Sequence, residues 1–194
     1  MLAAQKQNEK GFTLIEAIVA AAIFATAVVS IVDVYTSTVR LNRKTDGQRK
    51  ASENARYITE YLSKEIRNGQ VDYFGPTVSP CTTNFAYSAR TLGLVNTDNV
   101  HLCFYMGDDA GLVSSSGTNL WLIKGNAGPY KINSDDVTTT NIIFFTSPQA
   151  NPYTTQSAIQ PRVTITGTVT AKATGATSNF ETTVTIPAYD IIAP

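Results

Sequence analysis

The sequence predicts an α+β protein in which one long N-terminal helix packs on an antiparallel β-sheet. Residues 12–32 form a continuous apolar run, residues 33–68 continue with helical periodicity, and residues 69–194 contain short segments of alternating apolar and polar side chains. Helices repeat every 3.6 residues and strands every two. The change of period therefore divides the chain into a helical part and a β-rich part.

The apolar run is long enough to cross a membrane. The polar residues that interrupt it are Thr13, Glu16, Thr26 and Ser30. A helix of about 20 apolar residues crosses a hydrocarbon core of about 30 Å. A secretory signal peptide has a shorter core of about 7–15 residues, so a membrane span is the better interpretation. A plain membrane anchor would contain the same run and remains an alternative.

The residues after the span have one apolar face. Residues 33–68 contain no proline and a single glycine, Gly47, which costs about 1 kcal/mol in a helix interior and predicts a bend. Gly69 stands where a C-terminal cap is expected. The apolar residues recur at the spacings of an amphipathic helix, and they are Ala51, Ala55, Ile58, Leu62 and Ile66.

The C-terminal region is predicted to form strands. Short β-type runs occupy residues 101–106, 120–124 and 141–146. Residues 163–170 and 180–186 alternate apolar and polar side chains on either side of a turn near Gly175, which predicts a β-hairpin with one buried face. We expect the apolar face of the helix to pack on this hairpin.

Composition and charge narrow the classes of function. The formal net charge is zero, and no basic cluster with interleaved aromatic residues follows residue 69, so no nucleic-acid partner is evident. The chain has two cysteines, Cys81 and Cys103, both beyond the apolar run. In an oxidising compartment they would form a disulfide whose loop closure is worth about 3 kcal/mol. Two free, buried thiols are the alternative.

Neither an enzyme nor a cofactor site is predicted. His101 and Cys103 are two residues apart in a strand-like run, which would permit a Cys–His nucleophile, although such residues are more often ordinary strand side chains. Acidic pairs at residues 108–109 and 135–136 supply the oxygen ligands that Ca²⁺ prefers. The twelve-residue calcium loop is missing, so turn chemistry is the better interpretation. We expect no catalytic residue, no metal and no other cofactor.

A short motif opens the apolar run. Its glycine, aromatic residue and Thr-Leu-Ile-Glu sequence are found in the segment Lys10-Gly11-Phe12-Thr13-Leu14-Ile15-Glu16. This segment resembles the signature of type IV pilins and of the pseudopilins of type II secretion, and the leader before it has the usual length. Residues 48–69 and 178–190 are similar to the corresponding parts of larger minor pilins and minor pseudopilins. The resemblance covers mainly the N-terminal third of the chain.

The resemblance implies how the chain is processed. A prepilin peptidase would cut between Gly11 and Phe12 on the cytoplasmic side and would methylate the new amino group of Phe12. Glycine suits the scissile position, because a residue without a side chain lets an enzyme approach the peptide bond closely. The implied partners are the prepilin peptidase, the membrane and other pilin or pseudopilin subunits, and the implied fold is pilin-like.

Glu16 is predicted to act in assembly. A carboxylate inside a membrane helix costs about 2.5–3.5 kcal/mol on insertion scales, so such a residue usually has a partner and a function. After cleavage the nearest cation is the amino group of Phe12, in the same chain or in a neighbouring subunit of a fibre. Because Glu16 lies only one turn into the span, snorkelling to the membrane interface is the alternative.

The predicted topology places the leader in the cytoplasm and the β-rich domain outside it. The chain would be a single-pass protein of the inner membrane and then a part of a pilus or pseudopilus. The positive-inside rule favours the opposite orientation, because Lys6 and Lys10 precede the span and a larger set of cations follows it. That set is Arg40, Arg43, Lys44, Arg49 and Lys50. We follow the motif, since the peptidase site must face the cytoplasm.

The predicted organisation has four parts: a leader at residues 1–11, a transmembrane and polymerisation helix at 12–32, an amphipathic half of the stalk helix at 33–68, and an exported β-rich domain at 69–194. The predicted function is that of a structural minor subunit of a type IV pilus or secretion pseudopilus. Residues 12–46 lack the mid-helix proline or glycine of many major pilins, which favours a minor subunit. The alternative is a membrane-anchored exported binding module, either an adhesin or a DNA-uptake pilin.

Overall fold

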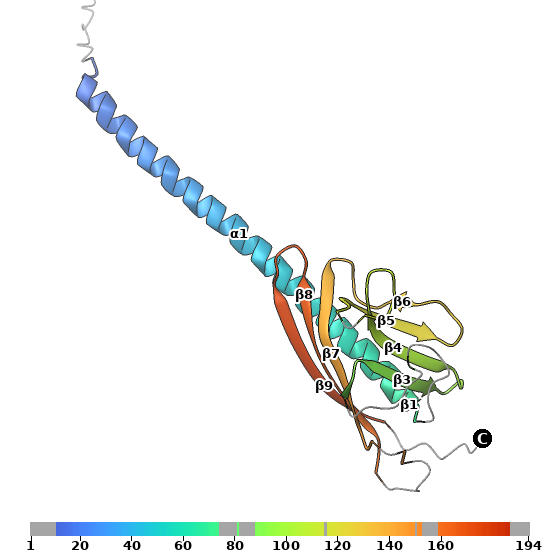
Figure 1. Ribbon diagram of the computed structural model, residues 1–194. Helices are drawn as coiled ribbons and strands as arrows, with labels where there is room; N and C mark the ends of the chain where they lie inside the picture. The colour runs from blue at the N-terminus through green and yellow to red at the C-terminus, as the bar shows by residue number, and fades with distance from the viewer. Residues whose placement is uncertain are drawn as a thin grey trace, which may run out of the picture. The chain divides into compact units, whose positions relative to one another are not determined.

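The computed structural model describes residues 11–73, 81, 88–114, 116–149, 151–152 and 159–186. These residues form one long helix and nine strands (Figure 1). The chain divides into two units, Met1–Arg43 and Lys44–Pro194. The combination of a long N-terminal helix with antiparallel sheets confirms the predicted α+β class.

The strands form two antiparallel sheets, with the orders β1-β3-β4-β5-β6 and β2-β7-β8-β9. The strands of the five-stranded sheet are β1 (Gly69–Val71), β3 (Thr91–Asn96), β4 (His101–Gly107), β5 (Asn119–Lys124) and β6 (Tyr130–Lys131). Those of the four-stranded sheet are β2 (Ser88–Ala89), β7 (Val137–Ser147), β8 (Arg162–Ala171) and β9 (Thr177–Thr185). The predicted runs at 101–106 and 120–124 correspond to β4 and β5.

Strands β8 and β9 form the predicted hairpin, in which Val163 is paired with Val184. Along β8 the buried residues Val163 and Ile165 alternate with partly exposed threonines such as Thr164. Gly175 in the connecting turn has a φ of 69°, a left-handed conformation that glycine adopts without strain. The alternation and the turn residue together explain why this hairpin was predictable.

Strands β1, β2, β3 and β6 are absent from the sequence prediction, and β7 is longer than predicted. Three of the four unpredicted strands have two or three residues, which is too short for a periodic signal, and Gly93 interrupts the apolar pattern of β3. Strand β7 begins at Val137, and Asn141, with a φ of 54°, lies at the register shift between Thr140 and Ile143. The predicted start of this strand is therefore a bulge in its interior.

Helix α1 (Leu14–Arg67) contains the predicted apolar run and continues well beyond it. By length and composition it could cross a membrane. Large apolar side chains of the run are exposed, among them Ile15, Ile23 and Phe24. Such a surface is unfavourable in water, because the hydrophobic effect scales with the apolar area that water contacts. This part of the helix therefore requires an apolar environment.

The C-terminal part of α1 is buried on one face. The predicted face is buried throughout, at Ala51, Ala55, Ile58, Leu62 and Ile66. These residues share one hydrophobic core with residues of both sheets, including Leu94 of β3 and Ile165 of β8. Tyr61 also meets Phe104 of β4 edge-on, with ring centroids 6.4 Å apart. The helix is thus packed on the predicted hairpin and also on the five-stranded sheet.

The glycines associated with α1 lie close to other segments of the chain. Helix α1 is continuous through Gly47, which is buried, and an added side chain there would overlap Thr174. Gly69 is not the predicted left-handed cap: it is the first residue of β1 and its φ is not positive. A Cβ on Gly69 would lie 3.0 Å from the Val95 carbonyl oxygen. Close packing accounts for both glycines.

Candidate functional site

Gly11, Phe12 and Thr13 form a junction segment that precedes α1. All three residues are exposed, and a Cβ added to Gly11 would meet nothing within 4 Å. Packing among the described residues therefore does not require glycine at position 11. Residues 1–10 of the predicted leader lie outside the described part of the chain.

Thr13 caps the N-terminus of α1. Its carbonyl oxygen accepts hydrogen bonds from the backbone N–H groups of Glu16 and Ala17 at 3.1 and 3.2 Å. Its side-chain oxygen accepts a longer hydrogen bond from the Glu16 N–H at 3.4 Å. The Thr-x-x-Glu spacing is the pattern of a capping box, a signal of the helix start that was present in the sequence and overlooked. The cap fixes the start of the helix two residues after Phe12.

The hydroxyl groups further along the apolar run are hydrogen-bonded within the helix. Thr26 Oγ1 donates to the Ile23 carbonyl oxygen at 2.8 Å, and Ser30 Oγ donates to the Thr26 carbonyl oxygen at 2.9 Å. A polar group in hydrocarbon is costly unless it is hydrogen-bonded. These internal hydrogen bonds make the run compatible with a lipid environment.

Glu16 differs from the other polar residues of the run. Its side chain lies in the first turn of α1, is exposed, and is in none of the ion pairs found among the described residues. The helix dipole favours an acidic group at this end. A carboxylate in apolar surroundings still needs a cationic partner, because its desolvation is expensive. The described part of the helix therefore does not supply the cationic partner that the Glu16 carboxylate needs in apolar surroundings.

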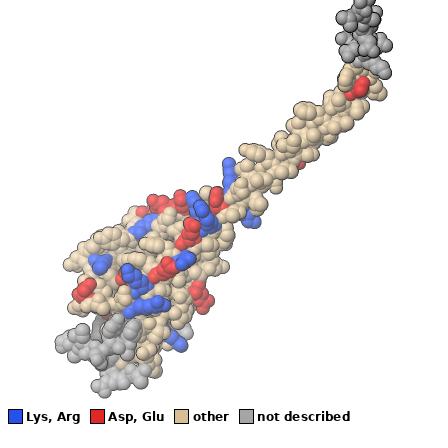
Figure 2. All heavy atoms as spheres, turned by 180° about the vertical axis from the view of Figure 1, so that it is seen from behind, with Lys and Arg blue, Asp and Glu red and all other residues tan. Residues whose placement is uncertain are grey.

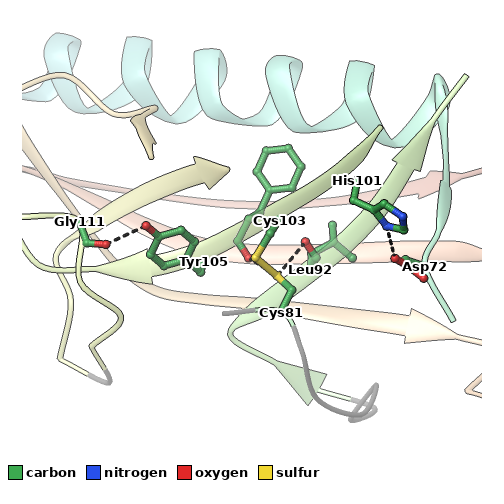
Figure 3. Close-up of a disulfide and its surroundings, with 8 residues drawn as sticks. Asp72, Cys81, Leu92, His101, Cys103, Tyr105 and Gly111 are labelled. Carbon is green, nitrogen blue, oxygen red and sulfur yellow. Dashed lines mark hydrogen bonds and ion pairs between the residues drawn. A yellow bond between two sulfur atoms is a disulfide. The ribbon is translucent and has the colours of Figure 1, made fainter. Parts of the chain in front are cut away.

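Cys81 and Cys103 form a disulfide bond, with an S–S distance of 2.00 Å (Figure 3). The bond is buried in a small cluster with Tyr105, Trp121 and Ile123. Along β4 these residues alternate with those of the main core, so the cluster lies on the opposite face of the five-stranded sheet. The disulfide fastens residue 81 to the middle of that sheet.

Tyr105 and Trp121 hold the loop between β4 and β5. The Tyr105 hydroxyl donates to the Gly111 carbonyl oxygen at 2.8 Å (Figure 3), and Trp121 Nε1 donates to the Asp108 carbonyl oxygen at 3.0 Å. Burial raises the pKa of the Tyr105 hydroxyl, and the negative charge of Asp108 raises this pKa further. The neutral phenol is therefore the form that the fold favours.

His101 and Cys103 do not form a nucleophile pair. The Cys103 sulfur is bonded to Cys81, and Nδ1 of His101 lies 2.7 Å from Oδ2 of Asp72 (Figure 3). Asp72 is 3% exposed and directly follows β1, so this contact connects β1 with the start of β4. The two residues are 29 positions apart, and no local sequence pattern could have paired them.

The loop carboxylates are used in turns and ion pairs. Asp108 Oδ1 accepts hydrogen bonds from the N–H groups of residues 110 and 112, each at 2.9 Å. Asp109 Oδ1 accepts one from Asn119 Nδ2 at 2.8 Å, and Asp135 and Asp136 are paired with lysines. The described residues contain no group of three or more His, Cys, Asp or Glu side chains that could hold a metal ion.

The N-terminal segment matches a known protein family. Residues 6–32 match the prokaryotic N-terminal methylation motif, and this range includes Gly11, Phe12 and Glu16. No curated protein and no solved structure matches the chain. The motif lies at the start of a helix long and apolar enough to cross a membrane, which is the arrangement expected of a membrane-anchored protein that is processed at its N-terminus.

This motif is the prepilin signal of type IV pilins and pseudopilins. The N-terminal segment of the chain is therefore similar to that of type IV pilins and pseudopilins, as the resemblance implied. Its α+β arrangement, with a long N-terminal helix packed against antiparallel sheets, is consistent with a pilin fold.

Proposed function

We propose that the chain is a structural minor subunit of a type IV pilus or of a secretion pseudopilus. The observation that carries this proposal is the methylation motif at residues 6–32, which leads directly into α1. A prepilin peptidase would cleave between Gly11 and Phe12 and would methylate the amino group of Phe12. The mature helix would then anchor the subunit in the membrane and pack against neighbouring subunits in the fibre.

The proposed organisation follows the change of exposure along α1. Residues 1–11 are the leader, 12–32 the transmembrane and polymerisation helix, 33–68 the amphipathic half of the stalk, and 69–194 the exported domain. The exposed apolar residues of the run and the buried face near residues 51–66 support these boundaries. The disulfide supports a domain outside the cytoplasm, because such bonds persist in oxidising compartments. Before assembly, the single span holds the subunit in the inner membrane.

Glu16 is the proposed assembly contact. Its exposed carboxylate is in none of the ion pairs of the described residues, and cleavage creates a cation at Phe12. In a staggered fibre, Glu16 of one subunit would pair with the amino group of Phe12 of the next. The pair would neutralise two charges in an apolar environment and would fix the axial position of each subunit.

The lack of helix-breaking residues favours a minor subunit. Residues 12–46 contain neither proline nor glycine, and α1 is continuous from Leu14 through this segment. Many major pilins have such a residue, at which the helix can melt during assembly. A helix without one suits a subunit that is present in few copies.

Processing is tested by the intact mass of the protein in the membrane fraction. Wild-type protein should have lost residues 1–11 and gained one methyl group, whereas Gly11→Val should remain uncut because its side chain blocks the enzyme. Gly128→Val is the matched control, since a Cβ at Gly128 also meets nothing within 4 Å. Normal processing of Gly11→Val would show that the peptidase assignment is wrong.

A groove in the folded domain favours a second candidate function, that of a membrane-anchored binding module such as an adhesin or a DNA-uptake pilin. The groove has a volume of about 690 Å³, and its lining includes Tyr57, Tyr61, Leu122, Lys124, Tyr130 and Lys131. Small-molecule sites are typically concave and mostly apolar, with a few polar groups. Recovery of the cleaved protein in sheared fibres supports the subunit function; a cleaved protein that stays in the membrane fraction supports the binding module.

A further inference from the structure

Exposed cations follow the apolar run on α1. Figure 2 shows that the largely uncharged stretch of the helix gives way to a surface on which Lys and Arg side chains are interspersed with Asp and Glu. The first two cations after the run are Arg40 and Arg43, and both are exposed. They are three residues apart, which places them on the same side of the helix.

Arg40 and Arg43 are in none of the ion pairs found among the described residues. Lys44, the next cation, is likewise in none of these ion pairs, whereas Arg49 lies 3.8 Å from Glu53 and Lys50 lies 2.9 Å from Asp136. The positive charges of Arg49 and Lys50 are therefore compensated within the folded domain. Those of Arg40 and Arg43 are available to a partner outside the chain.

The position of these arginines along the helix identifies an anionic partner. With a rise of 1.5 Å per residue, Arg40 lies about 12 Å and Arg43 about 16 Å beyond Val32, the end of the apolar run. The headgroup layer extends about 5–7 Å beyond the hydrocarbon on each side of a bilayer. The distance from each arginine to the lipid phosphates is therefore no more than the Debye length of about 8 Å plus the length of the arginine side chain.

The residues between the run and the arginines fit the same placement. Tyr35 lies about 5 Å beyond Val32 along the helix, at the depth of the headgroups, where the amphipathic rings of Tyr and Trp are favoured. Its side chain is 69% exposed, and Val34 beside it is 67% exposed. A tyrosine at the interface followed by two arginines is an arrangement that suits a lipid surface.

We propose that Arg40 and Arg43 bind the phosphate groups of anionic phospholipids in the leaflet from which the folded domain emerges. The proposal rests on the proposed function, which makes residues 12–32 a membrane span. A guanidinium group matches phosphate oxygens with two parallel hydrogen bonds. The contact also accounts for cations on the exported side of the span, where the positive-inside rule alone would not place them.

The test uses the mature, full-length protein in nanodiscs that contain equal amounts of phosphatidylglycerol and phosphatidylcholine. Native mass spectrometry of the released protein counts the lipids of each kind that remain bound. Wild-type protein should retain more phosphatidylglycerol, and Arg40→Gln/Arg43→Gln should lower the phosphatidylglycerol-to-phosphatidylcholine ratio by about fivefold for each arginine. Raising the NaCl concentration from 0.05 to 0.5 M should lower the wild-type ratio as well.

The matched control is Arg56→Gln/Lys64→Gln, which removes two exposed cations further along the same helix and should leave the lipid ratio unchanged. An unchanged ratio in Arg40→Gln/Arg43→Gln would overturn the lipid contact. Insertion is measured separately, as resistance to extraction from membranes by alkaline carbonate. Wild-type protein that is extracted would overturn the membrane span and the lipid contact together, whereas inserted protein without a lipid preference would overturn the lipid contact alone.

Discussion

Gly47 of α1 and Thr174 of the β8–β9 turn are in direct contact, since the three heavy atoms nearest to a Cβ built on Gly47 all belong to Thr174. One residue further along the helix, Gln48 Nε2 donates to the Thr177 carbonyl oxygen at 3.1 Å. Together the two contacts hold the hairpin turn against the helix. The glycine makes this possible because a side chain at position 47 would occupy the space of Thr174.

Gly47→Ala should destabilise the folded domain. The added Cβ forces the hairpin turn away, at a cost of about 1–3 kcal/mol, which equals or exceeds the helix propensity of about 1 kcal/mol that alanine gains over glycine. In a Thr174→Gly background the space is free, so the same substitution should become stabilising by up to about 1 kcal/mol. The measurement is the thermal unfolding of the wild type, of each single variant and of the double variant. A Gly47→Ala effect of the same sign in both backgrounds would show that the contact with Thr174 is not the cause.

Removal of the disulfide should destabilise the domain by about 3 kcal/mol, because the denatured chain then regains the freedom of the loop between Cys81 and Cys103. The double substitution Cys81→Ser/Cys103→Ser avoids a stray thiol, and urea unfolding measures the loss. Hydrogen exchange should increase most in β3, which lies inside that loop. Free thiols in exported wild-type protein, detected by non-reducing peptide mapping, would contradict this prediction.

Glu16→Val should block assembly without blocking insertion. The span becomes more apolar by about 2.5–3.5 kcal/mol, so insertion should improve or stay the same. Cleavage should persist, since the scissile bond lies about one turn upstream of residue 16. Incorporation into fibres should fall, because the amino group of Phe12 loses its buried partner, and Glu16→Asp should be intermediate. The measurement is the ratio of subunit in sheared fibres to subunit in the membrane, and a wild-type ratio for Glu16→Val would favour snorkelling of Glu16.

Tyr105 should make stability sensitive to alkaline pH. Its pKa in the folded protein is raised, first by burial and then by Asp108, so its contribution to stability is fully present below the ordinary tyrosine pKa of about 10. That contribution is lost as the pH rises through the raised pKa, because the unfolded chain ionises first. Phenolate formation is followed by ultraviolet absorbance in the wild-type protein and in Tyr105→Phe. The wild-type curve should contain one additional tyrosine that ionises above the ordinary tyrosine pKa. Tyr105→Phe should also cost about 0.5–1.5 kcal/mol through the lost hydrogen bond to Gly111.

The features that the sequence predicted depend on local periodicity. The buried face from Ala51 to Ile66 and the hairpin around Gly175 each repeat over enough residues to identify their element and its buried side. The junction at Gly11 and Phe12 was recognisable because its residues are contiguous. These signals need no knowledge of the rest of the chain.

The features that the sequence did not predict depend on contacts between distant residues. The contact of Gly47 with Thr174 and the pair of Asp72 with His101 form only when separate segments meet in space. The short strands at the sheet edges form because β3 and β5 offer them backbone partners. Thr13 is different, because its capping pattern is local and was overlooked.

The hydroxyl groups of Thr26 and Ser30 donate to carbonyl oxygens of their own helix. This part of α1 consequently presents no unused hydroxyl donor to its surroundings, whether these are acyl chains or the side chains of another protein. Exchange of one apolar neighbour for another then changes only van der Waals contacts, which are individually weak and break one at a time. Because these hydroxyl groups are hydrogen-bonded within the helix, the helix can move from one apolar environment to another without breaking a hydrogen bond, and its activation barrier is lower for that reason.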